Sequence, residues 1–228
     1  MIRGALIGSR FEHCTLDNYH VTAFNRDAHE ACWSVVRGDA EGVFLQGPVG
    51  VGKTHLLVGL AKAFVARRTP DAGETGADAV RVPPIREILR RAEEDDGGES
   101  DPTPVKLDPH ERMHEPIVEY WPILDLVSEL RVEARIGELE LSQRCRMCDL
   151  LLIDDLGAER ITDFVSQELG RIIDWRYRDR RSIAVATNLE DREIVEKYGW
   201  RAISRWTESC ERIKVEGPDY RERRKGSA

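Results

Sequence analysis

Apolar residues along this chain fall into two patterns that alternate with each other. Uninterrupted apolar runs of strand length lie at 43–45, 150–153 and 183–186. Between the first two runs, the segment His55–Val65 has helical spacing that places its leucines and its phenylalanine on one face. Apolar runs without polar alternation are typical of parallel strands that helices cover on both faces. The pattern therefore predicts an α/β domain with a buried parallel sheet.

Two weaker runs, Ile117–Tyr120 and Ile213–Val215, are further strand candidates. We therefore expect a five-stranded parallel sheet in a three-layer αβα arrangement. The chain has 228 residues and contains no internal repeat and no second set of core elements, so one domain is sufficient. We assign the core to residues 41–228 and treat residues 1–40 as an N-terminal lead-in segment that is too short for a core of its own.

The segment 69–116 differs in composition from the rest of the chain. It is rich in proline, glycine and charged residues, and the stretch 71–119 contains fourteen acidic and six basic residues. The other residues include equal numbers of acidic and basic side chains, so the whole formal net charge of −8 arises in this stretch. Such a composition buries little apolar surface. We expect an acidic, flexible insertion in the core, either simply solvated or used to dock a partner.

The sequence G-P-V-G-V-G-K-T at Gly47–Thr54 follows the first apolar run and precedes the helical segment. It satisfies every fixed position of the Walker A motif, the phosphate-binding loop of P-loop NTPases. Glycines allow successive backbone N–H groups to turn toward an anion, and the start of the helix favours negative charge. We therefore expect a nucleoside triphosphate to bind here, rather than a glycine turn without a ligand. The expected binding residues are Gly47, Pro48, Val49, Gly50, Val51, Gly52, Lys53, Thr54 and His55.

Two side chains of this loop have specific expected roles. The Lys53 ammonium group is expected to reach the β- and γ-phosphates, where it also serves catalysis. The Thr54 hydroxyl is expected to be one of the ligands of Mg²⁺.

The apolar run 150–153 ends in two carboxylates, Asp154 and Asp155, which is the Walker B pattern. At the carboxyl end of a central strand, Asp154 is expected beside the phosphate loop as a second Mg²⁺ ligand. Asp155 is expected to orient the attacking water as a catalytic base. The alternative is that both aspartates only cap the start of the next helix.

The run 183–186 is followed by Thr187 and Asn188, a small hydroxyl and an amide at the same expected edge of the sheet. The amide of Asn188 can donate to a γ-phosphate oxygen and accept from a water molecule. We therefore expect Asn188 to sense the terminal phosphate and to take part in catalysis. The alternative is an Asx turn before the next helix.

Several blocks of sequence, taken in their order, resemble the DnaC/IstB group of AAA+ ATPases, which comprises helicase loaders and transposition helpers. These blocks are F-E-H-C-T-L-D-N-Y, G-P-V-G-V-G-K-T-H-L, L-L-L-I-D-D-L-G, I-I-D-W-R-Y-R-D-R-R, A-T-N-L and I-S-R-W-T-E-S-C-E-R-I-K-V-E-G-P-D-Y-R. The resemblance implies an AAA+ fold, ATP and Mg²⁺ as cofactors, and assembly of identical subunits through the nucleotide interface. It also implies single-stranded DNA and a replicative helicase or a transposase as partners.

In this group, an arginine of one subunit reaches the γ-phosphate bound to a neighbour. The resemblance places that arginine finger at Arg205, and Arg201 is the competing candidate. A guanidinium that arrives only on assembly makes hydrolysis depend on assembly. The alternative role for Arg205 is a surface ion pair with Glu208, three residues later.

The chain departs from the AAA+ pattern in three respects, of which the acidic insertion at 69–116 has been described above. About forty residues precede the first core strand, too few for a separate helicase-binding domain. We also expect no full C-terminal lid after the last strand. Helicase loading is therefore one of two expected roles, beside transposition.

We therefore interpret the chain as a Mg²⁺-dependent, ATP-binding and ATP-hydrolysing AAA+ protein of DNA replication or transposition. The alternative is an ATP-gated adaptor with negligible turnover, and a P-loop kinase is a weaker third possibility. Direct contact with DNA is expected only from local basic segments, Arg176–Arg181 and Arg221–Lys225, because the chain as a whole is acidic.

The cysteines and the hydropathy of the chain indicate in which cellular compartment the protein lies. Cys145 and Cys148 form a single C-x-x-C without a second pair of ligands, so we expect reduced thiols rather than a zinc site. We see no signal peptide and no apolar run long enough to cross a membrane. The sequence therefore predicts a cytoplasmic protein without membrane contact.

Overall fold

The computed structural model describes residues 1–5, 7–69, 116–137 and 140–220. In this part of the chain, six parallel strands form one sheet in the order β1-β3-β4-β5-β2-β6. The strands are β1 (Ile2–Gly4), β2 (Gly42–Gln46), β3 (Val118–Pro122), β4 (Leu150–Leu156), β5 (Ser182–Thr187) and β6 (Glu211–Lys214).

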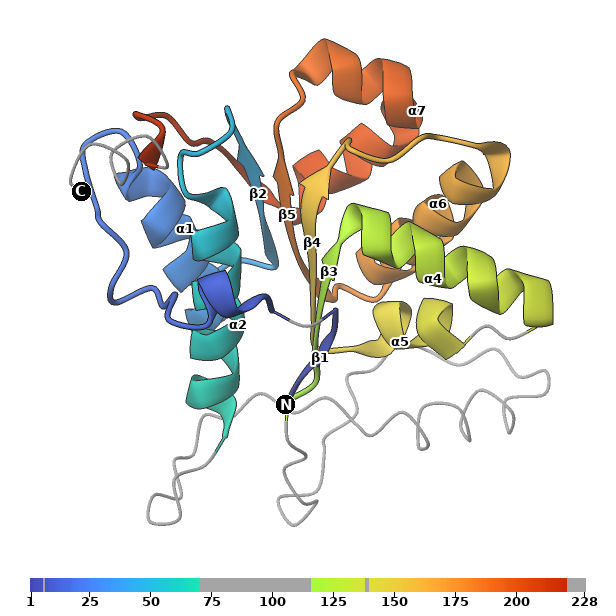
Figure 1. Ribbon diagram of the computed structural model, residues 1–228, viewed down its shortest axis with the longest axis horizontal. Helices are drawn as coiled ribbons and strands as arrows, with labels where there is room; N and C mark the ends of the chain where they lie inside the picture. Colours follow the sequence, from blue (N-terminus) through green and yellow to red (C-terminus); the bar gives the residue numbers. More distant parts are fainter. Residues whose placement is uncertain (6, 70–115, 138–139, 221–228) are drawn as a thin grey trace, which may run out of the picture.

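Helices cover both faces of the sheet, so the expected three-layer α/β arrangement is confirmed. Figure 1 shows α1 and α2 on one face and α4, α5, α6 and α7 on the other. The α-helices are α1 (Arg26–Arg37), α2 (Lys53–Arg68), α4 (Ile123–Ile136), α5 (Glu140–Met147), α6 (Asp163–Arg178) and α7 (Asp191–Ser209), and a short 3₁₀ helix spans Ser9–Phe11. Helix α7 is interrupted at Gly199, whose φ of 79° and ψ of 160° are not helical.

The expected number of five strands was wrong, because β1 forms a sixth strand at one edge of the sheet. All five predicted strands are present. Strand β1 is only three residues long and pairs with β3 through Ile2 and Val118, Arg3 and Glu119, and Gly4 and Tyr120. A strand this short, with one large apolar residue, has no periodicity that distinguishes it from a loop.

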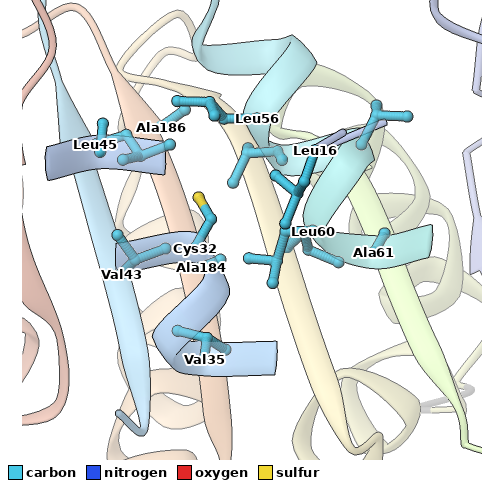
Figure 2. Close-up of a cluster of buried hydrophobic side chains, with 14 of the residues drawn as sticks. Leu16, Cys32, Val35, Val43, Leu45, Leu56, Leu60, Ala61, Ala184 and Ala186 are labelled. Atoms are coloured by element: carbon cyan, nitrogen blue, oxygen red, sulfur yellow. The ribbon is translucent and has the colours of Figure 1, made fainter. Parts of the chain in front are cut away.

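One hydrophobic core lies between the sheet and the pair α1 and α2. Figure 2 shows its centre, where leucines of α2 meet small and branched side chains of β2 and β5. Leu16 and Cys32, from the first 40 residues, are buried in the same cluster. The lead-in segment therefore contributes both an edge strand and part of the core.

The second core lies on the other face, under α4 to α7, and contains a buried guanidinium. Arg176 is 1% exposed, and its Nη1 donates to the carbonyl oxygens of Cys145 and Cys148 at 2.8 and 3.0 Å. Arg181 is also largely covered and donates to the carbonyl of Met147 at 2.5 Å. These two arginines thus help to pack α6 against α5. Fewer basic side chains of the segment Arg176–Arg181 are therefore exposed to solvent than the sequence indicates.

Three expectations fall on residues outside the described part of the chain. The acidic insertion expected at 69–116 lies there except for its first and last residues, and so does the basic segment 221–225. The expected lack of a lid concerns positions after Tyr220, which also lie outside it. None of the described helices combines the length and the apolar character needed to span a membrane.

Candidate nucleotide site

The predicted phosphate loop connects the end of β2 to the start of α2. Gly50 and Gly52 have φ values of 86° and 97°, in the left-handed region that favours glycine. Gly52 is the N-cap of α2, and neither a side-chain cap nor an acidic residue occupies the first turn of that helix. The first N–H groups of α2 are therefore suited to bind an anion.

Lys53, the first residue of α2, points back along this loop. Its Nζ donates to the carbonyl oxygens of Gly47 and Pro48 at 2.6 and 2.7 Å and to Asn188 Oδ1 at 2.7 Å. The side chain is buried, being 8% exposed. An ammonium group held in this way is a fixed positive charge beside the loop and is linked directly to the end of β5.

Asp154, near the end of β4, lies against the same helix start. It accepts a hydrogen bond from the side chain of Thr54, and its Oδ2 accepts from the Tyr120 hydroxyl at 2.9 Å. Burial raises the pKa of Asp154, and the hydrogen bonds from Thr54, Tyr120 and the Asp155 backbone act in the opposite direction. Burial and the charge of Asp154 raise the pKa of Tyr120, so its hydroxyl remains a donor.

Asp155 differs from Asp154 because the strand is irregular at this point. Two residues of β4 lie between Ile153 and Leu156, opposite one residue of β5, and Asp155 has a φ of 55°. The Asp155 side chain is exposed, and its Oδ1 accepts from Asn188 Nδ2 at 2.6 Å. The irregular register thus leaves one carboxylate buried beside Thr54 and the other exposed beside Asn188.

Three separate sequence motifs therefore meet at one edge of the sheet. Strands β2, β5 and β4 are neighbours, and their carboxyl ends lie at the top of the sheet in Figure 1. Asn188 connects the motifs, since it accepts from Lys53 and donates to Asp155. The structure brings these residues together as the sequence led us to expect. Their chemical roles remain predictions.

The donor set fits a magnesium ion by its chemistry. The Thr54 hydroxyl and the Asp154 carboxylate are hard oxygen donors, and the two side chains are hydrogen-bonded to each other. No group of three or more His, Cys, Asp or Glu side chains suited to a metal occurs among the described residues. A site with two protein ligands is typical of Mg²⁺, which keeps water and phosphate oxygens as its other ligands.

His55 contacts the lead-in segment. Its Nε2 lies 2.9 Å from the carbonyl oxygen of Thr15 and 2.9 Å from Asn18 Oδ1, and its ring is edge-on to Tyr19 at 5.1 Å. Burial lowers the pKa of His55. His55 thus anchors the segment around Tyr19 beside the phosphate loop.

Arg205 and Arg201 lie on α7 and share one partner on α6. Arg205 Nη1 is 2.7 Å from Asp174 Oδ1, and Arg201 Nη2 is 3.2 Å from Asp174 Oδ2. The Arg205 side chain is 18% exposed, whereas that of Arg201 is 78% exposed. The partner of Arg205 is therefore Asp174, and Glu208 instead accepts from Ser204 and Tyr177.

Sequence reasoning missed three side chains that touch this site. Tyr120 binds Asp154, the Tyr19 hydroxyl donates to the carbonyl oxygen of Val51 at 3.3 Å, and Asp219 lies against Gly50. Tyr120 carries a detectable signal, because it is a polar-tipped residue near the end of an apolar strand. Tyr19 and Asp219 reach the loop from distant segments, and although both lie in blocks of the family resemblance, no local chemistry marks their contact with the loop.

Comparisons with known proteins locate similar structures but no similar sequences. No protein-family model and no curated protein matches the sequence. Among solved structures, the DnaC helicase loader aligns with a TM-score of 0.66 and 19% identity, over 91% of this chain and 99% of that one. DnaI aligns with a TM-score of 0.61 and 16% identity, over 96% of each chain.

The replication initiator DnaA, bound to AMPPCP and single-stranded DNA, aligns with a TM-score of 0.61 and 20% identity. The alignment covers 90% of this chain but only 50% of the DnaA chain. All three neighbours are AAA+ replication proteins. The chain therefore has the α/β fold of the AAA+ P-loop NTPases.

Proposed function

We propose that this chain is a Mg²⁺-dependent AAA+ ATPase that acts in DNA replication. The observation that carries the proposal is the hydrogen-bonded arrangement of Lys53, Asn188 and Asp155 beside the pair Thr54 and Asp154. Phosphate-binding, metal-binding and water-orienting groups are thereby gathered at the end of three adjacent strands. The AMPPCP of the DnaA neighbour supports the choice of a nucleotide as the ligand.

Each residue has a proposed role that its position supports. Lys53 binds the β- and γ-phosphates after exchanging its contacts with the Gly47 and Pro48 carbonyl oxygens for phosphate oxygens. Thr54 and Asp154 hold Mg²⁺, which when bound neutralises phosphate charge. Asp155, exposed and hydrogen-bonded to Asn188, orients the attacking water.

Asn188 is proposed to couple the terminal phosphate to that water. It contacts Lys53 through its oxygen and Asp155 through its nitrogen. When a γ-phosphate replaces Asn188 as a partner of Lys53, the amide oxygen of Asn188 can accept a hydrogen bond from another group. The same side chain can then report whether the terminal phosphate is present.

The proposed context is replication, with single-stranded DNA and a replicative helicase as partners. The DnaC neighbour, a helicase loader, is matched over 99% of its length, and the DnaA neighbour is bound to single-stranded DNA. A transposase is the alternative partner, and the role in either case belongs to the cytoplasm. The five cysteines are buried and form no disulfide bond among the described residues, which is in keeping with a reducing compartment.

Identical subunits are proposed to assemble through the nucleotide interface, with Arg205 of one subunit acting on the γ-phosphate held by the next. Arg205 contacts α6 of its own chain through Asp174. It is therefore available to a neighbour only if that ion pair opens or adjusts on assembly. Arg201, with most of its side chain exposed, is the competing arginine.

The experiment that tests this function is an ATPase assay over a series of protein concentrations, with and without single-stranded DNA. Wild type, Lys53→Ala and Arg205→Ala are compared, with Arg171→Ala as a control for loss of a surface arginine on α6, outside the segment expected to contact DNA. Activity that rises steeply with concentration or DNA, and is lost in the first two variants only, supports an assembling ATPase. Tight ATP binding without turnover in every condition contradicts it and supports the adaptor.

A further inference from the structure

The C-terminal segment of the described chain runs beside the predicted phosphate loop. Strand β6 pairs with β2, and beyond it Val215 N donates to the carbonyl oxygen of Gln46 at 2.7 Å. Five residues later, Tyr220 N donates to the carbonyl oxygen of Gly50 at 3.1 Å. Figure 1 shows this red segment next to the loop between β2 and α2. The segment is thus fixed to the last residue of β2 at one end and to the loop at the other.

The side chain between these two anchors that meets the loop is a carboxylate. A Cβ built on Gly50 would lie 2.0 Å from Asp219 Oδ1 and 2.2 Å from its carboxyl carbon. The Asp219 carboxylate therefore fills the space in which any other residue at position 50 would place its side chain. Glycine at position 50 therefore allows both the close approach of this acidic group and the left-handed backbone conformation of the loop.

This placement brings a negative charge to the loop that is proposed to bind a polyanion. ATP carries three to four negative charges, and the Coulomb energy between like charges a few ångströms apart is large at a protein surface. The carboxylate is half-buried and belongs to a segment held by main-chain hydrogen bonds, so bulk water screens it less than a mobile surface acid.

We propose that Asp219 weakens the binding of the triphosphate and thereby sets how readily nucleotide leaves the site. The inference rests on the proposed function, since it concerns the same loop. It assigns to the segment Val215–Tyr220 a second task besides packing. Any partner that draws this segment away from Gly50 raises the affinity for ATP, which makes the segment a route for regulation.

The test is a fluorescence titration of wild type, Asp219→Asn and Glu216→Gln with MANT-ATP and MANT-ADP. Glu216 is an exposed acid of the same segment and is the matched control. We expect Asp219→Asn to bind MANT-ATP about tenfold more tightly, a change of about 1.4 kcal/mol, and Glu216→Gln to stay within about twofold of wild type. Asp219→Glu, which keeps the charge, is expected to show no gain.

Four further readouts separate a charge effect from a structural one. The gain is expected to be larger for ATP than for ADP, and to shrink as salt is raised. It is also expected for inorganic tripolyphosphate, measured as a competitor of MANT-ADP, because this anion has neither base nor ribose. Thermal unfolding of the unliganded variants shows whether the fold is intact.

The outcomes distinguish this inference from the proposed function. If wild type and all variants fail to bind nucleotide while remaining folded, the proposed function fails. If all bind equally, or if Asp219→Asn binds more weakly, nucleotide binding stands and the inference about Asp219 is overturned. An equal gain for ATP and ADP that salt does not change also overturns it.

Discussion

Two adjacent carboxylates in this site have different surroundings, and their chemistry is expected to differ accordingly. Asp154 is 7% exposed and accepts from Thr54, Tyr120 and the Asp155 backbone. Asp155 is exposed and accepts from Asn188. The first has the fixed oxygen position that a metal ligand needs, and the second has the access to solvent that a group orienting water needs.

Single amide substitutions are expected to separate the two roles. Asp155→Asn is expected to bind ATP with nearly wild-type affinity but to lose hydrolysis by about 100-fold or more, because the water is no longer oriented. Asp154→Asn is expected to lose the gain in affinity that Mg²⁺ gives, because it removes a charged ligand. Both effects are measured by MANT-ATP titration with and without Mg²⁺, together with phosphate release.

Asp163→Asn is the matched control, because Asp163 is an exposed carboxylate in the first turn of α6. It is expected to leave both measurements unchanged. Equal losses of binding in Asp154→Asn and Asp155→Asn would contradict a division of roles. Unchanged turnover in Asp155→Asn would point instead to another water-orienting group.

At the scale of elements, the contact between α2 and the lead-in segment connects the N-terminal residues to the phosphate loop. Gly59 lies inside α2, and a Cβ built on it would be 2.7 Å from the backbone nitrogen of Leu16. Leu16 is buried against the helix, and Tyr19, three residues later, donates to Val51 in the loop. The glycine therefore permits a close approach of backbone to helix that holds Tyr19 in place.

Two glycine-to-alanine substitutions in helices are expected to have opposite effects on stability. Gly170→Ala in α6, where nothing lies within 4 Å of the new Cβ, is expected to stabilise the protein by about 0.5–1 kcal/mol. Gly59→Ala is expected to destabilise it by about 1–3 kcal/mol, because the new methyl group displaces the backbone near Leu16. Urea unfolding measures both, and the same sign for the two would contradict the packing argument.

For the whole molecule, the sequence was informative wherever an apolar run ended in a polar residue. The runs at 150–153 and 183–186 predicted central strands β4 and β5, and the residues after them meet at the expected edge. These features are local, because an uninterrupted apolar run and its neighbours in sequence determine both the strand and its end. The resemblance in the order of motifs then led to the correct fold.

Features that depend on distant contacts could not be predicted in this way. Strand β1 exists only through its pairing with β3, across more than a hundred residues. Arg176 has the sequence surroundings of a solvated base, yet tertiary packing buries it under carbonyl groups of α5 and the residue after it. Helical spacing indicated Glu208 as the partner of Arg205. The actual partner is Asp174, because the packing of α6 against α7 brings it close, and spacing within one helix does not show this.

The proposed assembly makes a prediction that only the whole molecule can test. If one subunit holds ATP and the next supplies the arginine, Lys53→Ala and Arg205→Ala damage opposite sides of the same interface. Each variant alone is then inactive, whereas mixed assemblies contain some interfaces that are intact on both sides. An equal mixture is expected to regain about a quarter of wild-type turnover, the share of intact interfaces for random mixing in a cyclic assembly.

The measurement is phosphate release from the mixture at a protein concentration where wild type is fully active. The control mixture combines Lys53→Ala with Asp155→Asn, which both damage the nucleotide-holding side, and it is expected to stay inactive. The role would pass to the more exposed arginine if Arg201→Ala alone were inactive and regained activity in the mixture with Lys53→Ala, while Arg205→Ala did not. No recovery with either arginine variant would indicate that Arg205 acts within its own chain through Asp174, and hydrolysis would then not require a neighbour.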